Sequence, residues 1–181
     1  DVGYDHSTDL GATSGSDHDY THTTYAATTE DVDGQNLHFQ SAGDDYVHVK
    51  GNMTNATLTF DGGNDTLQVD GHFSGTIDAA NNGAGVHLHA STFTQGSINL
   101  GGGNDWLSFG GIAAGTTINA GAGNGDNMML HLDNAEELAG KFDLSGVKGI
   151  ENLWIDTTNS QPDTINDSFL TTAATALNGT E

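Results

Sequence analysis

Short stretches of alternating apolar and polar residues recur through the middle of the chain, about once every 20 residues. Each repeat begins with a turn rich in Gly, Asn and Asp, and a second short stretch follows after another Gly-containing turn. Alternation with a period of two is typical of strands, so the pattern predicts an all-β fold, a β-solenoid in which each repeat forms one coil. The apolar pairs of the first stretch are Val47/Val49, Leu67/Val69, Val86/Leu88, Leu107/Phe109 and Met128/Leu130. Those of the second stretch are Leu58/Phe60, Ile77/Ala79, Ile98/Leu100, Ile118/Ala120 and Phe142/Leu144.

The predicted solenoid has about five to six coils of roughly 20 residues each. Five coils lie between residues 41 and 145, and residues 150–155 continue the sheet, so that the solenoid occupies 41–156 of a single domain, 1–181. Stacked coils are separated by about 4.8 Å, and their inward residues form ladders. An antiparallel sandwich with Gly-rich hairpins is the alternative, but the fixed offsets of the turns favour the solenoid.

The two ends of the chain depart from the repeat, as terminal repeats do. Residues 1–40 are expected to be an irregular segment packed on the solenoid or extending from it. Residues 157–181 are expected to form a C-terminal cap, in which Asn166 and Asp167 begin a short helix and Gly179 ends it. The apolar face of that helix would cover the last coil through Phe169, Leu170, Ala173, Ala174 and Leu177.

Charge narrows the classes of partner. Twenty Asp and five Glu stand against three Lys and no Arg, which gives a net charge of −22. Such a chain has too few cations to neutralise phosphates, so we expect neither nucleic-acid binding nor binding to anionic membranes. No apolar run approaches membrane-spanning length, and insertion into a membrane is not expected. The absence of Cys excludes disulfides, zinc-thiolate sites and thiol catalysis.

The acids gather in the turns that open each coil, above all in Gly-Asn-Asp-x-Leu. Glycine allows the tight backbone of such a turn, and converging carbonyl and carboxylate oxygens suit Ca²⁺ better than Mg²⁺. We therefore expect a calcium-bound solenoid in which the ions are structural, while ordinary Asx-turns are the alternative. The candidate ligands are Asp44, Asp45, Asp61, Asn64, Asp65, Asn104, Asp105, Asn124 and Asp126.

Gly63-Asn-Asp-Thr-Leu67 and Gly103-Asn-Asp-Trp-Leu107 resemble the RTX calcium-binding nonapeptide, although Phe60-Asp61 and Leu100-Gly101 occupy its leading Gly-Gly positions. The coil of about 20 residues is closer to the long-coil solenoids of giant RTX adhesins of Gram-negative bacteria. Residues 149–155 and 163–167 also resemble segments of those adhesins. Within that group the chain is most similar to the peptide-binding domain. The resemblance implies a calcium-stabilised solenoid that captures short peptide ends, with a bound Ca²⁺ helping to hold the ligand carboxylate.

A binding surface is suggested by the outward positions of the first stretch. Tyr46, Thr66, Gly85 and Trp106 are expected to form one column, with the two aromatic residues flanking a low floor. The alternative is that residues 1–33 cover Trp106. The next column is expected to hold His48, Gln68, His87 and Ser108, with His131 at its foot. A metal-binding or pH-sensing role and a plain solvated face both remain open for this histidine column.

Together these observations predict a calcium-dependent adhesin module, extracellular and at the cell surface, which acts as a monomeric part of a larger chain. It would bind a short peptide or a protein terminus on another cell, in cell adhesion, biofilm formation or host attachment. The alternatives are an ice-binding solenoid, suggested by outward Thr57, Thr59 and Thr76, and a calcium-rigidified spacer. We do not expect an enzyme, since no Ser-His-Asp motif stands out, although a carboxylate pair for glycoside cleavage stays open.

Overall fold

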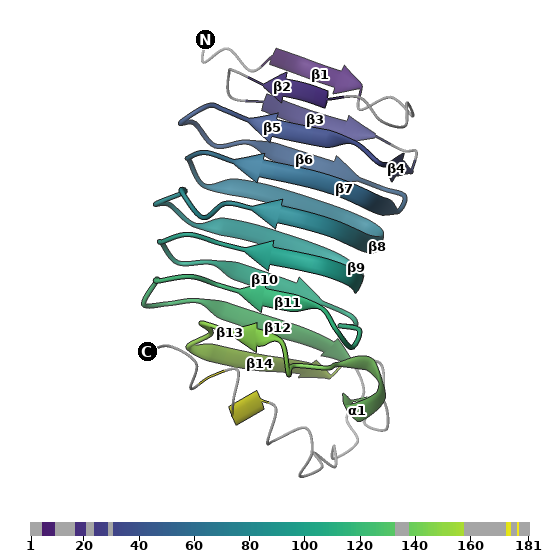
Figure 1. The fold of residues 1–181 in the computed structure, drawn as a ribbon, viewed down its shortest axis with the longest axis vertical. Helices are drawn as coiled ribbons and strands as arrows, with labels where there is room; N and C mark the ends of the chain where they lie inside the picture. Colours follow the sequence, from purple (N-terminus) through teal and green to yellow (C-terminus); the bar gives the residue numbers. More distant parts are fainter. Residues whose placement is uncertain are drawn as a thin grey trace.

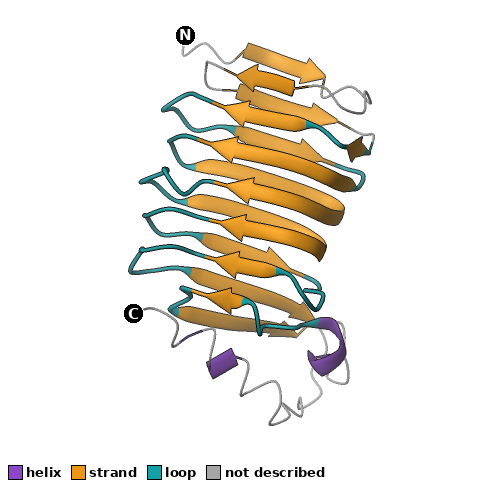
Figure 2. Cartoon of the chain, in the orientation of Figure 1, coloured by secondary structure: helices purple, strands orange, loops and turns teal. Residues whose placement is uncertain are grey.

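The computed structural model describes residues 5–9, 17–20, 24–28, 31–132, 138–157, 173–174 and 177. These residues form an all-β protein, a parallel β-solenoid of about six turns whose coils stack from the N-terminal to the C-terminal end (Figures 1 and 2). The prediction of the fold class from alternation and turn spacing is therefore confirmed. In the described part of the chain, no helix is long and apolar enough to span a membrane.

Two long ladders of parallel strands form the two main faces of the stack. The first face is built from β1 (Asp5–Asp9), β3 (Thr24–Thr28), β6 (Tyr46–Val49), the first part of β8 (Asp65–Asp78) and of β9 (Val86–Asn99), β10 (Trp106–Phe109), β12 (Asn127–Leu132) and β14 (Asn152–Thr157). The second face is built from β2 (Asp17–Tyr20), β5 (Asn36–Phe39), β7 (Met53–Phe60), the last part of β8 and of β9, β11 (Thr117–Asn119) and β13 (Val147–Lys148).

A short third ladder closes the corner at which the chain passes from the first face to the second. It consists of β4 (Val32–Asp33), the beginning of β7 and the middle of β8 and β9. Bridges to Ile112 and Phe142 continue it toward the C-terminal end. The chain thus turns through three stretches in each coil, which leaves a narrow interior filled by side chains from all three.

Inward side chains form the core as ladders of like residues. Leu67, Leu88 and Leu107 lie opposite one another on the first face, and all three are buried. Aromatic rings stack between coils, with ring centroids 5.4 Å apart for Phe73 and Phe93. Each fully buried side chain of this size contributes about 1.5–3 kcal/mol from burial, so the alternating pattern itself stabilises the stack.

The turns depend on glycine because the coils approach closely. Gly63 and Gly103 have φ angles of 99° and 108°, in the left-handed region that favours glycine. A Cβ at Gly63 would clash with the backbone of Gly43, and a Cβ at Gly103 would clash with the backbone of Ala84. The glycine of Gly-Asn-Asp-x-Leu is therefore required both by its own conformation and by the coil beside it.

The solenoid begins earlier than the predicted boundary at residue 41. Strands β1, β2, β3 and β5 already pair in parallel within 1–40, so the expectation of an irregular N-terminal segment is wrong for the described residues there. The alternation of apolar and polar residues is weak in this part of the sequence, because the small Ala26 occupies the buried position that Val47 and Leu67 fill in the next coils.

The C-terminal end departs from the predicted register. The coil between Asp126 and Glu151 is 25 residues long, and its extra residues include the short helix α1 (Leu138–Lys141). Val147, rather than Phe142, consequently pairs with Ile118. Most of the predicted cap, 157–181, lies outside the described residues, but Ala173 is buried in the core and Leu177 packs against it.

Candidate functional site

Four predicted calcium ligands form a buried column at the corner that precedes the first face. Asp45, Asp65, Asp105 and Asp126 occupy the same place in their coils, and each is at most 2% exposed. Val86 takes this place in the coil between Asp65 and Asp105. These four aspartates are called the acid column below. They point into the solenoid, because each precedes an outward residue and strands alternate.

One oxygen of the carboxylate ties each coil to the coil before it. The backbone N–H of Asp45 donates to Oδ1 of Asp65 over 2.9 Å, and that of Val86 donates to Oδ1 of Asp105 over 2.7 Å. The N–H of Asp105 donates in the same way to Oδ1 of Asp126 over 2.8 Å. At the C-terminal end Glu151 continues the pattern by accepting the N–H of Asp126. The acid column thus has a structural role before any ion is considered.

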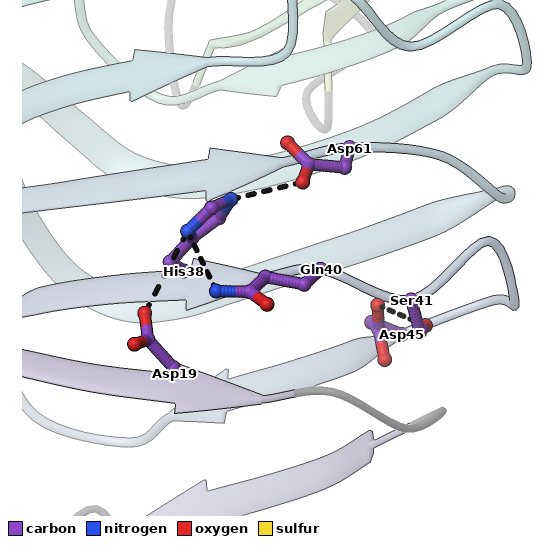
Figure 3. Close-up of polar contacts among 6 residues, drawn as sticks. All are labelled: Asp19, His38, Gln40, Ser41, Asp45 and Asp61. Carbon is purple, nitrogen blue, oxygen red and sulfur yellow. Dashed lines mark hydrogen bonds and ion pairs between the residues drawn. The ribbon is translucent and has the colours of Figure 1, made fainter.

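The second carboxylate oxygen differs between the two halves of the column. In the N-terminal half it accepts a hydrogen bond from a side chain. The Ser41 hydroxyl donates to Oδ2 of Asp45 over 3.1 Å (Figure 3), and the Asn82 amide donates to Oδ2 of Asp65 over 2.9 Å. Asn82 is buried and also donates to the carbonyl of Gly63. The site around Asp65, Asn82 and Gly63 is called the closed corner.

In the C-terminal half the second oxygen has no partner. Oδ2 of Asp105 and Oδ2 of Asp126 are buried and accept no hydrogen bond from any residue that the structure describes. Gly123 packs closely beside Asp126: a Cβ there would lie 2.6 and 2.8 Å from the two carboxylate oxygens, and it would clash with the carbonyl oxygen of Gly103. The absence of a side chain at Gly123 therefore lets the backbone lie against three oxygen atoms. The site formed by Asp105, Asp126, Gly103 and Gly123 is called the open corner.

Burial disfavours the ionised form of these carboxylates. It raises the pKa of Asp65 and of Asp105 to about 7, from an ordinary value of 3.8. Burial also raises the pKa of Asp126, and the neighbouring Glu151 raises it further. The charge of Asp126 adds to the effect on Asp105. A cation at the open corner would remove this penalty, because its charge would offset both carboxylates.

Oxygen atoms of the backbone would have to complete any such cation site. Within the described ranges, no group of three His, Cys, Asp or Glu side chains is placed to hold a metal ion. A hard cation such as Ca²⁺ takes 6–8 oxygen ligands, and backbone carbonyls are common among them. The carbonyl of Gly103 together with two carboxylates is an oxygen-only set, which fits Ca²⁺ and does not fit a metal that prefers nitrogen or sulfur.

The remaining predicted metal ligands lie on the outside of the turns. Asp44, Asn64, Asn104 and Asn124 are exposed, and Oδ1 of Asp44 accepts the backbone N–H of Asn64 over 2.8 Å. Asp61 faces a different direction and contacts Nε2 of His38 at 3.0 Å, and the same imidazole lies 3.6 Å from Asp19 (Figure 3). The structure therefore separates four buried acids from a set of outer polar residues.

The predicted binding column is correct except at one position. Tyr46, Thr66, Trp106 and Asn127 lie in one outward column of the first face, but His87 stands between Thr66 and Trp106 where Gly85 was expected. Asp65 pairs with Val86 at an offset of 21 residues, and the next coil is shorter by two. A fixed 20-residue repeat therefore misplaces the strand. His87 is exposed, so no low floor separates Tyr46 from Trp106.

Two further apolar residues of the first face were not predicted as part of the site. Trp154 is 54% exposed, and its indole N–H donates to Oδ1 of Asn127, the neighbour of Trp106 across the strands. Met129 lies between Ser108 and Trp154 in the adjoining column. Trp106, Met129 and Trp154 are called the aromatic patch. Because the coil after Asp126 is longer than the others, a 20-residue repeat does not predict that Trp154 pairs with Met129.

The second outward column also differs from the prediction. It contains His48, Gln68, His89, Ser108 and Met129, so His89 replaces His87. The hydroxyl of Ser108 lies 3.1 Å from Nδ1 of His89 and 2.7 Å from Nε2 of His131. Nδ1 of His131 in turn lies 3.2 Å from Oδ2 of Asp156. Burial and the nearby His131 lower the pKa of His89.

The second face offers a mixed surface. Thr57, Thr76, Ser97 and Thr117 form one outward column, whereas the next holds Thr59, Asp78, Asn99 and Asn119. The exposed Asp78 interrupts what would otherwise be a neutral array of short hydroxyl and amide side chains. Comparison of the chain with protein-family models, curated proteins and solved structures gives no match.

Proposed function

We propose that the protein is a calcium-dependent binding module of the RTX adhesin type, which holds a short peptide on the first face of the solenoid. The observation that carries this proposal is the open corner. Two buried carboxylates there each keep an oxygen without a hydrogen bond among the described residues, and the backbone of Gly123 packs against Asp126 and the carbonyl of Gly103. Leaving a buried polar group unsatisfied costs about 1–3 kcal/mol, and a hard cation would satisfy both groups at once.

Calcium in this proposal is structural. Asp105 and Asp126 are at most 1% exposed, so an ion between them would contact the protein on most sides. Bound there, it would neutralise the carboxylates and join the coil that begins with β10 to the coil that begins with β12. This placement favours a rigidifying role over direct contact between the ion and the carboxylate of a ligand.

The binding surface in this proposal is the aromatic patch. Trp154 is the one large hydrophobic side chain among the described residues that is mostly exposed, Trp106 and Met129 are half-buried on the same face, and exposed aromatic residues are typical of recognition sites. Trp106 directly follows Asp105, so cation binding at the open corner would fix the strand that presents it. The net charge of −22 favours a neutral or basic peptide. An extracellular location at the cell surface, with the peptide carried by another cell, is part of the same proposal.

Thermal melting in calcium, in excess chelator and in magnesium tests the cation site. A ligand at 100 times its dissociation constant stabilises a folded protein by about 2.7 kcal/mol, which corresponds to a rise in Tm of about 5–10 °C at this size. We expect such a rise with calcium and a much smaller one with magnesium. Equal melting in calcium and in chelator would contradict the proposal.

Peptide capture tests the binding surface separately. An array of short peptides with free termini is probed in calcium with the wild-type protein, with Trp154→Ala and with Trp106→Ala. Both variants should fold, because each residue points outward, and both should lose most of the captured signal. Thr59→Ala, on the second face, is the matched control and should capture as the wild type does. If both tryptophan variants capture peptides as well as the wild type does, the binding surface lies elsewhere.

A further inference from the structure

Ser108, His131 and Asp156 are connected in the order found in serine hydrolases. Oγ of Ser108 lies 2.7 Å from Nε2 of His131, and Nδ1 of the same ring lies 3.2 Å from Oδ2 of Asp156. Both distances fall within the 2.6–3.2 Å expected between a nucleophile, its base and the group that orients the base. The register produces this arrangement: His131 pairs with Asp156 directly across the strands and reaches Ser108 along a diagonal.

The hydrogen bonds are compatible with the proton placement that a serine nucleophile requires. Asp156 can only accept at neutral pH, so Nδ1 of His131 carries the hydrogen and Nε2 is left as an acceptor. The hydroxyl of Ser108 then donates to Nε2 of His131. Nδ1 of His89, 3.1 Å from the same oxygen, therefore donates its hydrogen to Oγ. In this placement the serine proton is directed at Nε2 of an imidazole that is itself held by a carboxylate, which is the arrangement that activates a hydroxyl.

We propose that Ser108, His131 and Asp156 form a nucleophilic site that transfers small acyl groups from activated esters to water. His131 acts as the general base and Asp156 is a positioning residue that holds its ring. This inference goes beyond the binding function proposed above. Its hydrogen bonds follow from the register of the first face and involve no cation, while Met129 and Trp154 are shared with the aromatic patch.

The surroundings of Ser108 define the class of substrate. The serine is only 6% exposed, so the proposal is restricted to the smallest acyl groups, such as acetyl. Met129 and Trp154 follow it in the same column and offer an apolar surface for an aromatic leaving group. Backbone N–H groups beside Ser108 are used in the parallel ladder with β9 and β12, so they are not free to stabilise an oxyanion. The site should therefore act on aryl esters, whose leaving groups are good, and leave amides intact.

The proposed reaction has two steps. Oγ of Ser108 bonds to the carbonyl carbon while its proton moves to Nε2 of His131. The bond to the leaving oxygen then breaks, and the phenol departs with that proton, or the phenolate departs and His131 releases the proton to solvent. In the second step water attacks the acetyl-serine, His131 takes the proton of the water and returns one to Oγ, and acetate is released. No oxidant, reductant or cofactor is needed.

The test uses p-nitrophenyl acetate with the wild-type chain, Ser108→Ala, His131→Gln and Asp156→Asn. Release of p-nitrophenolate gives the rate, and peptide mass mapping after an acid quench locates the acetyl group. We expect acetylation of Ser108 in the wild type and at least a tenfold fall in rate in each variant, because general-base catalysis contributes about 10²–10⁴-fold. Asp156→Glu keeps a carboxylate and should recover part of the rate.

Two controls separate loss of the site from a general effect of substitution or from unfolding. Ser97→Ala removes a serine of the second face that pairs with Thr76 and Thr117, and it should leave the rate unchanged. Melting curves of all variants check folding, and Asp156 is exposed enough for its substitution to spare the core. If Ser108→Ala hydrolyses the ester as fast as the wild type, free imidazoles or lysines perform the reaction and the proposal is wrong. Absence of acetyl on Ser108 in the wild type would equally overturn it.

Discussion

The closed corner and the open corner have the same local sequence and different chemistry. Gly63-Asn-Asp-Thr-Leu67 and Gly103-Asn-Asp-Trp-Leu107 form matching turns that bury Asp65 and Asp105 at equivalent positions. Each aspartate accepts a backbone N–H from the previous coil through one oxygen. The other oxygen of Asp65 is bound by the amide of Asn82, and that of Asp105 is bound by nothing in the described structure.

The difference originates in the next coil rather than in the motif. Asn82 belongs to the turn of the coil that has Val86 in place of an aspartate. Its amide satisfies Asp65 and Gly63 together, so a neutral side chain occupies the place of a cation. The coil after Asp105 brings Gly123 and a second acid, Asp126, instead. A Gly-Asn-Asp turn therefore defines half of a site, and the following coil decides whether it needs an ion.

Conversion of the closed corner into an open one should have the largest effect. Asn82→Asp replaces the donating amide by a carboxylate facing Asp65 and the carbonyl of Gly63. Breaking a buried charged contact of this kind costs about 3–5 kcal/mol, so Tm in chelator should fall by roughly 10 °C. Calcium should restore much of that loss. Thermal melts in chelator and in calcium measure both values, and a variant that calcium leaves unchanged would show that two carboxylates are insufficient at this corner.

Neutralisation of the open corner should have opposite effects with and without calcium. Asp105→Asn keeps the oxygen that accepts from Val86 and removes the buried charge beside Asp126. In chelator we expect a Tm equal to or a few °C above that of the wild type, since about 1–3 kcal/mol of unsatisfied polar burial is relieved. In calcium most of the stabilisation should be lost.

Asp65→Asn is the matched control for that substitution. Its new amide would face the amide of Asn82, so it should lower Tm in chelator and in calcium alike and preserve the difference between the two conditions. Calcium stabilisation that is lost equally in Asp65→Asn and in Asp105→Asn would remove the distinction between the corners.

A change of pH should alter the stability of the calcium-free protein less than the substitutions above do, and the direction of the change tests the burial of the acids. Asp65 and Asp105 have pKa values of about 7 in the folded state, against an ordinary 3.8. Between these values the folded protein holds protons that the unfolded chain has released, so the free energy of unfolding falls as pH rises from about 4 to about 7 and then levels off. Melts in chelator at pH 5 and pH 8 should therefore give the higher Tm at pH 5. Calcium should reduce the difference, and a higher Tm at pH 8 in chelator would contradict the burial of these acids as neutral groups.

Sequence patterns predicted the repeat far better than they predicted the site. The alternation of apolar and polar residues and the spacing of the glycines predict the fold because every coil repeats the same inward positions. Leu67, Leu88 and Leu107 are one such set. The register failed wherever a coil changed length, which moved His87 into the place assigned to Gly85. Hydrogen bonds between coils, such as those of Asn82 and His131, depend on offsets of 17 and 23 residues and carry no local signature. A search for sequence motifs therefore could not predict the contacts that connect Ser108 to His131 and Asp156.

Substitution of the outer acids should have the smallest effect and completes the comparison. Asp44 and Asp61 were predicted as calcium ligands together with the acid column, but both are exposed, and they contact Asn64 and His38 respectively. Surface substitutions usually change stability by less than about 0.5 kcal/mol, so Asp44→Asn and Asp61→Asn should shift Tm by no more than about 2 °C. Both should keep the full difference between calcium and chelator, which melting curves under the two conditions measure. Loss of calcium stabilisation in either variant would mean that ions bind on the outside of the turns, because only there could these side chains reach one, and the distinction between open and closed corners would then no longer decide where calcium binds.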